Sequence, residues 1–386
     1  MANHKTYVTS PLLPDLEQFH ELLKEIWESK WITNNGSFHK QLEEELRVHL
    51  GISNISLFAN GTLPLVTALH ALGIHGEVIT TPYSFAATAH AIRWAGCTPV
   101  FADVDPLTAN LDPEKIEAAI TPETEAIMPV HCYGNPCDVK RIKQIADRHG
   151  LKIIYDAAHS FGVEIPVENQ STESSVKTES ILNWGDISTL SFHATKVYNT
   201  IEGGALITND DKIKKTVDLM KNFGIESEES IPLDGINAKL DEIRAAYGIL
   251  NLRLVEDAIS RRKRVASQYG EMLKGIEGIR MIEEMPGVKS NYSYFPVFID
   301  EAVFGCSRDH LYLDMAKEGI FCRRYFYPLL SDLAAYNELK SADPDNLPAA
   351  HRLANTVLCL PIHHEMGSFE VENIVSLIKK ASHHGL

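Results

Sequence analysis

The stretch SFHATKVYNTIEGG, residues 191–204, lies between two short apolar runs, residues 187–192 and 205–208. Runs of this kind are typical of buried strands, so Lys196 falls in the connection between two strands. A lysine among small and hydroxyl residues, ahead of a glycine pair that permits close backbone approach, can form a Schiff base when it is partly desolvated. Taken alone, however, the window is better explained by a solvated loop lysine, because lysines are common at strand ends.

A second run, LKIIYDAAHS at residues 151–160, ends on an aspartate and small residues. A carboxylate is often presented at the end of a parallel strand in this way, and Asp156 precedes Lys196 by 40 positions. Together the two motifs resemble the aspartate aminotransferase-like fold of enzymes that use pyridoxal 5'-phosphate (PLP). The closer resemblance is to the DegT/DnrJ/EryC1/StrS family of nucleotide-sugar aminotransferases, and it covers nearly the whole chain.

Length and pattern favour two domains in an α/β protein. At 386 residues the chain exceeds the size at which one core usually stays single. Strand-like runs at residues 99–104 and 126–130 alternate with helical patterns such as residues 138–149, which is typical of a mostly parallel sheet. The resemblance implies a large PLP-binding domain over residues 1–250 and a smaller C-terminal α+β domain over residues 251–386. A helical pattern over residues 241–273 predicts one long helix between them.

Composition excludes several classes of function. A formal net charge of −16 argues against nonspecific nucleic-acid binding, which needs a basic face. The six cysteines show no CxxC spacing, so neither a zinc site nor a disulfide framework is expected. No run approaches 18 apolar residues and the N-terminus leads into no signal core, so we expect a cytoplasmic protein without a membrane segment. Residues 166–179 predict an exposed insertion longer than the family pattern.

A Gly-Thr pair marks a possible phosphate site. Asn60, expected as N-cap, and Gly61-Thr62 end a strand just before a helical pattern, where unpaired backbone N–H groups favour an anion. Many helices begin this way without a ligand. The resemblance implies that the amides of Gly61, Thr62 and Leu63 hold the cofactor phosphate, although the family usually has serine where this chain has Asn60.

The resemblance also assigns roles to other residues. Lys196 would form the Schiff base and carry protons, and Asp156 would pair with the ring nitrogen. Phe85 would stack on the pyridine ring, and His159 would hydrogen-bond the phenolic oxygen. Ser191 would bind the phosphate, and Asn237 would reach the phosphate in the neighbouring subunit. The last contact implies a homodimer with shared sites. Without the resemblance, Phe85 would be a core ring and Asn237 a turn residue, and for His131 a structural role is favoured over lining the pocket.

Three residues are expected at the substrate. Thr33 and Asn34 lie in a segment that borders the sugar pocket in the family, and Tyr325 belongs to a Y-x-P-L segment similar to its sugar-nucleotide segment. The residues themselves also fit a turn and an edge strand. The resemblance implies that glutamate converts PLP to pyridoxamine 5'-phosphate, which then aminates a nucleotide-linked keto sugar with ping-pong kinetics.

The sequence resembles one group of family members most, and three alternatives to that activity remain open at this point. The V-T-x-P-x-L-P and W-I-T-N-N-G wording resembles members that aminate C4 of dTDP-4-keto-6-deoxyglucose, within O-antigen and lipopolysaccharide biosynthesis. An aminotransferase acting at C3 of a 3-keto isomer shares the S-F-H-A-T-K motif. A PLP-dependent 3-dehydratase would carry histidine where this chain has Lys196. A non-catalytic PLP-binding regulator is the non-enzyme reading, and a DNA-binding one would need a basic module that the sequence lacks.

Overall fold

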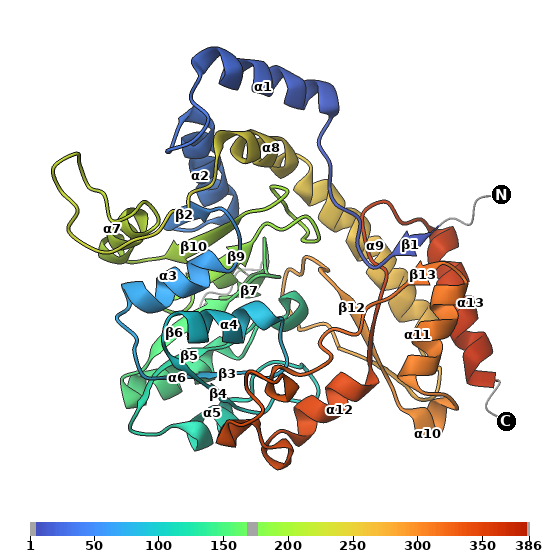
Figure 1. Cartoon of the computed structure of the whole chain (residues 1–386). Coiled ribbons are helices and arrows are strands. Elements are labelled where there is room, and N and C mark those ends of the chain that lie inside the picture. Colours follow the sequence, from blue (N-terminus) through green and yellow to red (C-terminus); the bar gives the residue numbers. More distant parts are fainter. Residues whose placement is uncertain (1–4, 168–176, 384–386) are drawn as a thin grey trace.

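The computed structural model describes residues 5–167 and 177–383. Its centre is a seven-stranded sheet in the order β2-β10-β9-β6-β5-β3-β4 (Figure 1). Only β10 runs antiparallel to its neighbours, β2 and β9, and the other pairs are parallel. The strands span Asn54–Phe58 (β2), Glu77–Thr80 (β3), Thr98–Phe101 (β4), Thr124–Met128 (β5), Lys152–Asp156 (β6), Ile187–Ser191 (β9) and Gly204–Thr208 (β10). The mostly parallel sheet predicted from the sequence is confirmed.

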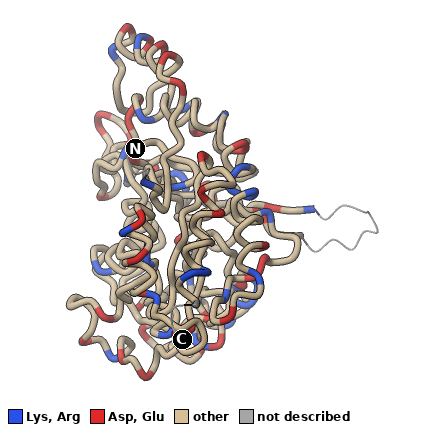
Figure 2. The backbone as a smooth tube through the Cα atoms, turned by 90° about the vertical axis from the view of Figure 1, so that its right-hand side faces the viewer, with Lys and Arg blue, Asp and Glu red and all other residues tan. Residues whose placement is uncertain are grey.

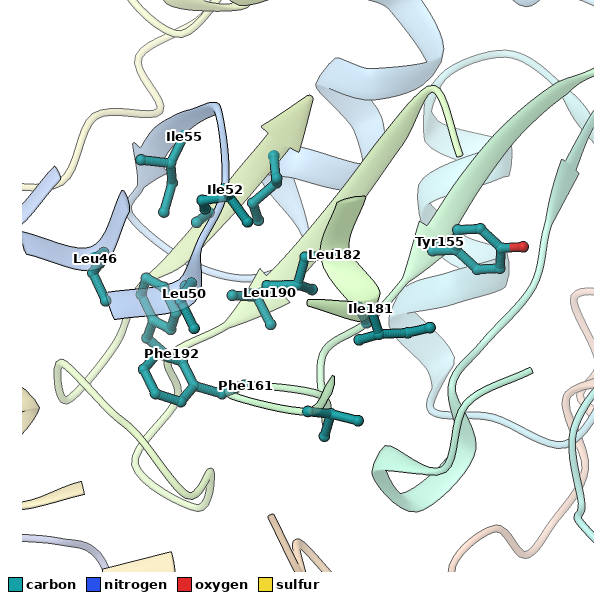
Figure 3. Close-up of a cluster of buried hydrophobic side chains, with 14 of the residues drawn as sticks. Leu46, Leu50, Ile52, Ile55, Tyr155, Phe161, Ile181, Leu182, Leu190 and Phe192 are labelled. Carbon is teal, nitrogen blue, oxygen red and sulfur yellow. The ribbon is translucent and has the colours of Figure 1, made fainter. Parts of the chain in front are cut away.

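Helices cover both faces of this sheet, as crossover connections between parallel strands require. One face packs on Leu63–Ala71 (α3), Ala86–Trp94 (α4) and Asp211–Met220 (α7). The opposite face packs on Ser37–Leu50 (α2), Pro113–Ala119 (α5), Val139–His149 (α6) and Glu242–Leu252 (α8), and Leu16–Ser29 (α1) lies against α8. Figure 3 shows part of the core on this opposite face, where Leu46 and Leu50 of α2 lie near Leu190 of β9, and Tyr155 of β6 lies at the other end of the cluster. Strands β6 and β9 pack in this core, and their last residues are Asp156 and Ser191. Dense packing of the strands therefore fixes the positions of these two residues.

The long helix predicted over residues 241–273 is wrong. The structure has α8 and a separate helix, Val255–Leu273 (α9), with a break at Arg253 and Leu254. Both break residues keep right-handed helical angles, and their N–H groups donate to the carbonyls of Leu250 and Asn251, three residues back, in place of the four-residue helical bond. The helix therefore turns without a proline or a glycine, and no composition signal marks the turn.

The C-terminal region is a smaller α+β unit. Its antiparallel sheet has the order β11-β12-β14, with strands Ile279–Met281, Phe295–Ile299 and Val357–Leu360. Helices Glu301–Phe304 (α10), Arg308–Lys317 (α11), Pro348–Thr356 (α12) and Ser368–His383 (α13) surround it. Short 3₁₀ turns complete the described part of the chain at Cys132–Gly134, Ile181–Asn183, Leu330–Asp332, Lys340–Ala342 and Pro344–Asn346. The α/β fold with a smaller α+β unit is the one expected.

The first strand of the chain belongs to this C-terminal region. Thr6–Tyr7 (β1) pairs in parallel with Ile320–Phe321 (β13), and Figure 1 shows both beside α13. The chain then crosses to the large sheet, where the Leu12 carbonyl accepts hydrogen bonds from Asn199, Tyr247 and Asn251. Three donors on one carbonyl fix the N-terminal arm across both parts of the molecule.

The segment expected as an insertion begins and ends on a pair of strands. Glu164–Pro166 (β7) pairs antiparallel with Thr178–Ser180 (β8), and residues 168–176 lie outside the described residues. Figure 2 shows the described ends of this segment projecting from the body, and charges of both signs interspersed over the whole tube. Within residues 5–167 and 177–383, no helix has the length and apolar character to cross a membrane, and no cluster of metal-ligating side chains occurs.

Candidate active site

A cavity of about 240 Å³ opens at the carboxyl ends of β6 and β9. This is the edge at which open α/β sheets bind ligands. Most of the residues expected at the cofactor or substrate line it: Gly61, Thr62, Phe85, Asp156, His159, Ser191, Lys196 and Tyr325. Motifs far apart in the sequence therefore meet at one place. A larger cavity, of about 510 Å³, lies between α9 and β11 and contains neither Lys196 nor Asp156.

Asp156 is the buried carboxylate of this cavity. Its Oδ2 accepts a hydrogen bond of 2.7 Å from the Thr88 hydroxyl, and its Oδ1 accepts one of 3.2 Å from the Ala158 N–H. The Thr88 hydroxyl lies 2.8 Å from the hydroxyl of Ser84, so a chain of side chains leads into the carboxylate. Burial raises the pKa of Asp156, whereas the two hydrogen bonds and the charge of Lys196 act in the opposite direction. A cation at this carboxylate would therefore favour its charged form.

Lys196 lies five residues beyond the end of β9 and is partly buried. Burial lowers the pKa of Lys196 to about 8, although the carboxylate of Asp156 acts to raise it. An amine with this pKa is uncharged in an appreciable fraction of molecules near neutral pH, and the uncharged form is the nucleophile. The solvated loop lysine considered from the sequence does not describe this environment.

His159 also lines the cavity. Its Nδ1 is buried and has no hydrogen-bond partner among the described residues. Its ring stacks on Phe326 at 6.0 Å and meets the edge of Tyr294 at 5.0 Å. Burial, and then the charge of Lys196, lower the pKa of His159 well below its usual value, so the ring is neutral. A ligand atom in the cavity would satisfy the free nitrogen.

Two glycines shape a narrow cradle beside Ser191. A Cβ on Gly61 would lie 2.7 Å from the Cβ of Ser191, and a Cβ on Gly204 would lie 2.4 Å from the carbonyl oxygen of Asn60. Helix α3 begins at Leu63 with Thr62 as N-cap, so the N-cap expected at Asn60 is displaced by two residues. The Asn60 side chain still has a capping role, because its Oδ1 accepts from the N–H groups of Thr62 and Leu63 at 2.9 and 3.0 Å.

Two aromatic side chains lie at the mouth of the cavity. Phe85 is the N-cap of α4 and its side chain is 61% exposed, so it is not the core ring that composition alone would suggest. Tyr325 is partly buried and meets Tyr294 edge to face at 5.5 Å. Both rings are free to contact a ligand that enters from solvent.

Four expected residues do not line the cavity of a single chain. Leu63 contributes its N–H only to Asn60, as described above. Thr33 and Asn34 are exposed in the turn between α1 and α2, and Asn237 is exposed in the segment before α8. Their roles stay predictions.

Other residues of the site were not anticipated from the sequence. Thr88, Tyr294 and Phe326 contact Asp156 or His159, yet their types and spacing carry no chemical signal. His131, for which a structural role was favoured, is buried against Tyr155 at 4.6 Å and does not line the cavity. Its Nδ1 accepts from the Cys137 N–H at 3.0 Å, and burial lowers the pKa of His131 to about 3.

The anchor of the His159 backbone comes from the C-terminal region. The carbonyl of His159 accepts hydrogen bonds from Asn291 Nδ2 at 2.7 Å and from Ser293 Oγ at 2.8 Å. Both donors are buried and lie just before β12. The C-terminal region thus fixes the backbone of His159, a residue that lines the cavity.

These features fit PLP. The cradle at Gly61 and Ser191 offers a hydroxyl and close backbone approach to a phosphate. The free nitrogen of His159 suits a phenolic oxygen, and the buried carboxylate of Asp156 suits a protonated ring nitrogen. Lys196, with its lowered pKa, is suited to a Schiff base.

Comparisons with known proteins agree with this geometry. The sequence profile of the "DegT/DnrJ/EryC1/StrS aminotransferase family" matches residues 15–379. The chain is 48% identical to "dTDP-4-amino-4,6-dideoxy-D-glucose transaminase" from Escherichia coli, over 97% of this chain and 99% of the relative. A relative of the same name from Shigella dysenteriae is also 48% identical, over 97% and 98%.

A crystal structure of DesI in the presence of its TDP-sugar product superposes with a TM-score of 0.91 at 34% identity, covering 99% of this chain and 94% of that one. A structure described as "Putative sugar aminotransferase Spr1654 from Streptococcus pneumoniae, PLP-form" superposes with a TM-score of 0.87 at 25% identity, covering 99% of this chain and 100% of that one. With the cavity, the matched profile and these relatives in agreement, the chain belongs to the DegT/DnrJ/EryC1/StrS family of PLP-dependent aminotransferases.

Proposed function

We propose that this enzyme transfers an amino group from glutamate to C4 of dTDP-4-keto-6-deoxyglucose and so makes dTDP-4-amino-4,6-dideoxyglucose. The observation that carries the proposal is the meeting of Lys196 and Asp156 in one cavity, on a chain that matches a transaminase of that name at 48% identity over 97% of its length. The same identity favours C4 over C3 as the aminated carbon. In this proposal the enzyme acts in the cytoplasm, and its product is used to build O antigen and lipopolysaccharide.

The residues of the cavity divide the work between binding and proton transfer. When bound, PLP supplies an aldehyde and an electron-withdrawing ring. Ser191 and the Gly61 N–H would bind its phosphate, because the N–H groups of Thr62 and Leu63 already donate to Asn60 Oδ1. Phe85 would cover one face of its ring and His159 would hydrogen-bond its phenolic oxygen. Thr88 donates to Asp156 and orients it, and the charged carboxylate would keep a proton on the ring nitrogen.

Lys196 serves both halves of the reaction. With PLP bound, its amine would hold the cofactor between turnovers, and as a free amine it would move a proton to or from the reacting carbon of the substrate. A pKa of about 8 suits this work, because the group can both accept and return a proton near neutral pH. Tyr325, at the mouth of the cavity, would contact the sugar nucleotide.

The proposed active unit is a homodimer. Thr33, Asn34 and Asn237 are exposed and lie outside the cavity of their own chain, which supports contacts to the site of a second subunit. Within each subunit, residues 1–250 would form the PLP-binding domain with its N-terminal segment, of which β1 pairs with the C-terminal region, and residues 251–386 the smaller domain. Mixing Lys196→Ala subunits with Asn237→Ala subunits should restore activity in heterodimers, since one site of each would be intact. No recovery after verified subunit exchange would contradict shared sites.

An assay with two keto sugars tests the proposed reaction. The PLP-loaded enzyme is given glutamate and either dTDP-4-keto-6-deoxyglucose or its 3-keto isomer, and NMR identifies the aminated carbon. We expect a 4-amino product, no product with Lys196→Arg, and unchanged turnover with the exposed control Lys143→Arg. Amination of the 3-keto isomer alone would refute the position of attack. Turnover retained by Lys196→Arg would refute the role of the lysine.

A further inference from the structure

A short segment before α8 is held on both sides by backbone hydrogen bonds. On one side the Ala59 N–H donates to the Ala238 carbonyl at 2.8 Å, next to an antiparallel bridge between Phe58 and Lys239. On the other side the Ala238 N–H donates to the Lys221 carbonyl at 3.0 Å, next to a bridge between residues 222 and 237. The backbone of residues 237–239 is therefore fixed by its neighbours. These backbone hydrogen bonds do not fix the directions of the side chains of residues 237–239.

Lys239 connects the side chains around this segment. Its ammonium donates to Asn237 Oδ1 at 2.9 Å and to Asn222 Oδ1 at 2.7 Å. The same ammonium lies 5.1 Å from the centre of the Phe223 ring. Two amide oxygens and an aromatic face thus hold one cation, while Asn237 itself is exposed.

This contact fixes which end of the Asn237 amide faces outward. An ammonium group has three donors and no acceptor, so it bonds to the oxygen of the amide and not to its NH₂ group. With the oxygen bound to Lys239, the two N–H donors of Asn237 turn away from the lysine. An exposed asparagine without this contact would be free to present either end.

We propose that Lys239 is a positioning residue: it orients Asn237 so that the side-chain NH₂ is presented to an anionic oxygen, the cofactor phosphate bound by the neighbouring subunit. This inference rests on the proposed role of Asn237 and adds the residue that makes that role possible. Lys239 also places a positive charge one hydrogen bond behind the donor, which strengthens an N–H bond to an anion.

The test compares two ligands that differ only in the phosphate. The affinities of the cofactor-free enzyme for PLP and for pyridoxal are measured by titration, and their ratio isolates the phosphate contribution. We expect Lys239→Met to weaken PLP binding roughly tenfold, the scale of one hydrogen bond to a charged group, with little change for pyridoxal. Lys239→Arg, which keeps the donors and the charge, should restore most of the ratio. Lys215→Met, at an exposed lysine paired with Glu226, is the matched control and should change neither affinity.

A double-mutant cycle decides whether Lys239 acts through Asn237. Once Asn237→Ala has removed the amide, Lys239→Met should cost nothing further in PLP affinity. An equal loss in both backgrounds, an equal loss for pyridoxal, or no loss in Lys239→Met would overturn the proposal. A wild-type enzyme that binds PLP no better than pyridoxal would instead contradict the proposed cofactor site itself, so the two failures are distinguishable.

Discussion

The lowered pKa of Lys196 leads to a prediction about its chemical reactivity. Burial lowers this pKa from the ordinary 10.5 to about 8. At pH 7 an amine with a pKa of about 8 is uncharged in about one molecule in ten, against about one in three thousand at the ordinary value. The uncharged, reactive fraction of Lys196 in the cofactor-free enzyme should therefore be roughly 300-fold larger at pH 7 than that of a lysine with the ordinary pKa, so Lys196 should be acylated faster at equal access.

Trace acetylation across a pH series measures this pKa directly. Only the uncharged amine reacts, so labelling of Lys196, located by peptide mass spectrometry, should rise through a midpoint near pH 8 and level off about one to two pH units higher. Lys214 is the internal control: burial acts to lower its pKa, but its ion pairs with Glu43 and Asp218 outweigh burial and raise it. Labelling of Lys214 should still be rising beyond pH 10.5.

Variants of the carboxylate test the cause. Asp156→Asn removes the charge that raises the pKa of Lys196, so the midpoint should move below that of the wild type. Thr88→Val removes a hydrogen bond that favours the ionised carboxylate of Asp156. The midpoint of Lys196 labelling in this variant should therefore lie between those of the wild type and Asp156→Asn. Asp147→Asn, at an exposed carboxylate on α6, is the control and should leave the midpoint unchanged. A wild-type midpoint near the ordinary value, or no shift in Asp156→Asn, would refute the reasoning.

Two further predictions concern packing and acid stability. Gly61→Ala places a Cβ 2.7 Å from the Cβ of Ser191, so it should lower the free energy of unfolding by about 1–3 kcal/mol and also weaken PLP binding. The control Gly270→Ala, at a helical position where a Cβ would meet no atom within 4 Å, should stabilise the protein by up to about 1 kcal/mol. Equal effects of the two substitutions in urea unfolding would contradict the tight packing at Gly61. His131 is buried and neutral in the folded protein, whereas in the unfolded chain it takes up a proton below about pH 6.5. The resulting loss of folding free energy is small above pH 6.5 and grows as the pH falls toward 3, reaching about 2 kcal/mol at pH 5. His131→Asn, which keeps an acceptor for Cys137, should lose less stability between pH 7 and 5 than the wild type, and an unchanged loss would exclude His131 as the cause.

The sequence allowed the strand-end motifs to be predicted because each is local. An apolar run that stops at Asp156 or Ser191 specifies both a buried strand and the residue at its exit. The same logic failed at Arg253 and Leu254, because the apolar spacing of four continues from Leu250 through Leu254 to Ala258 across the break. Periodicity cannot detect a turn that preserves the periodicity.

Residues whose importance is purely spatial could not be predicted. Thr88 acts on Asp156 from 68 positions away, and Asn291 holds the carbonyl of His159 from 132 positions away. Neither is marked by composition or by a neighbouring motif. The resemblance predicted the residues that would touch the cofactor, and the structure added those that hold them in place.

The pairing of β1 with β13 constrains how the protein folds during synthesis. Residues 6 and 7 leave the ribosome long before their partners at residues 320 and 321 have been made. Domains generally fold as units from the N-terminal end, so the seven-stranded sheet can form while the first strand is still unpaired. The C-terminal region is completed last, and only then is the chain's beginning drawn into place. A tag or a deletion at the start of the chain should therefore delay the final step of folding without preventing formation of the large sheet.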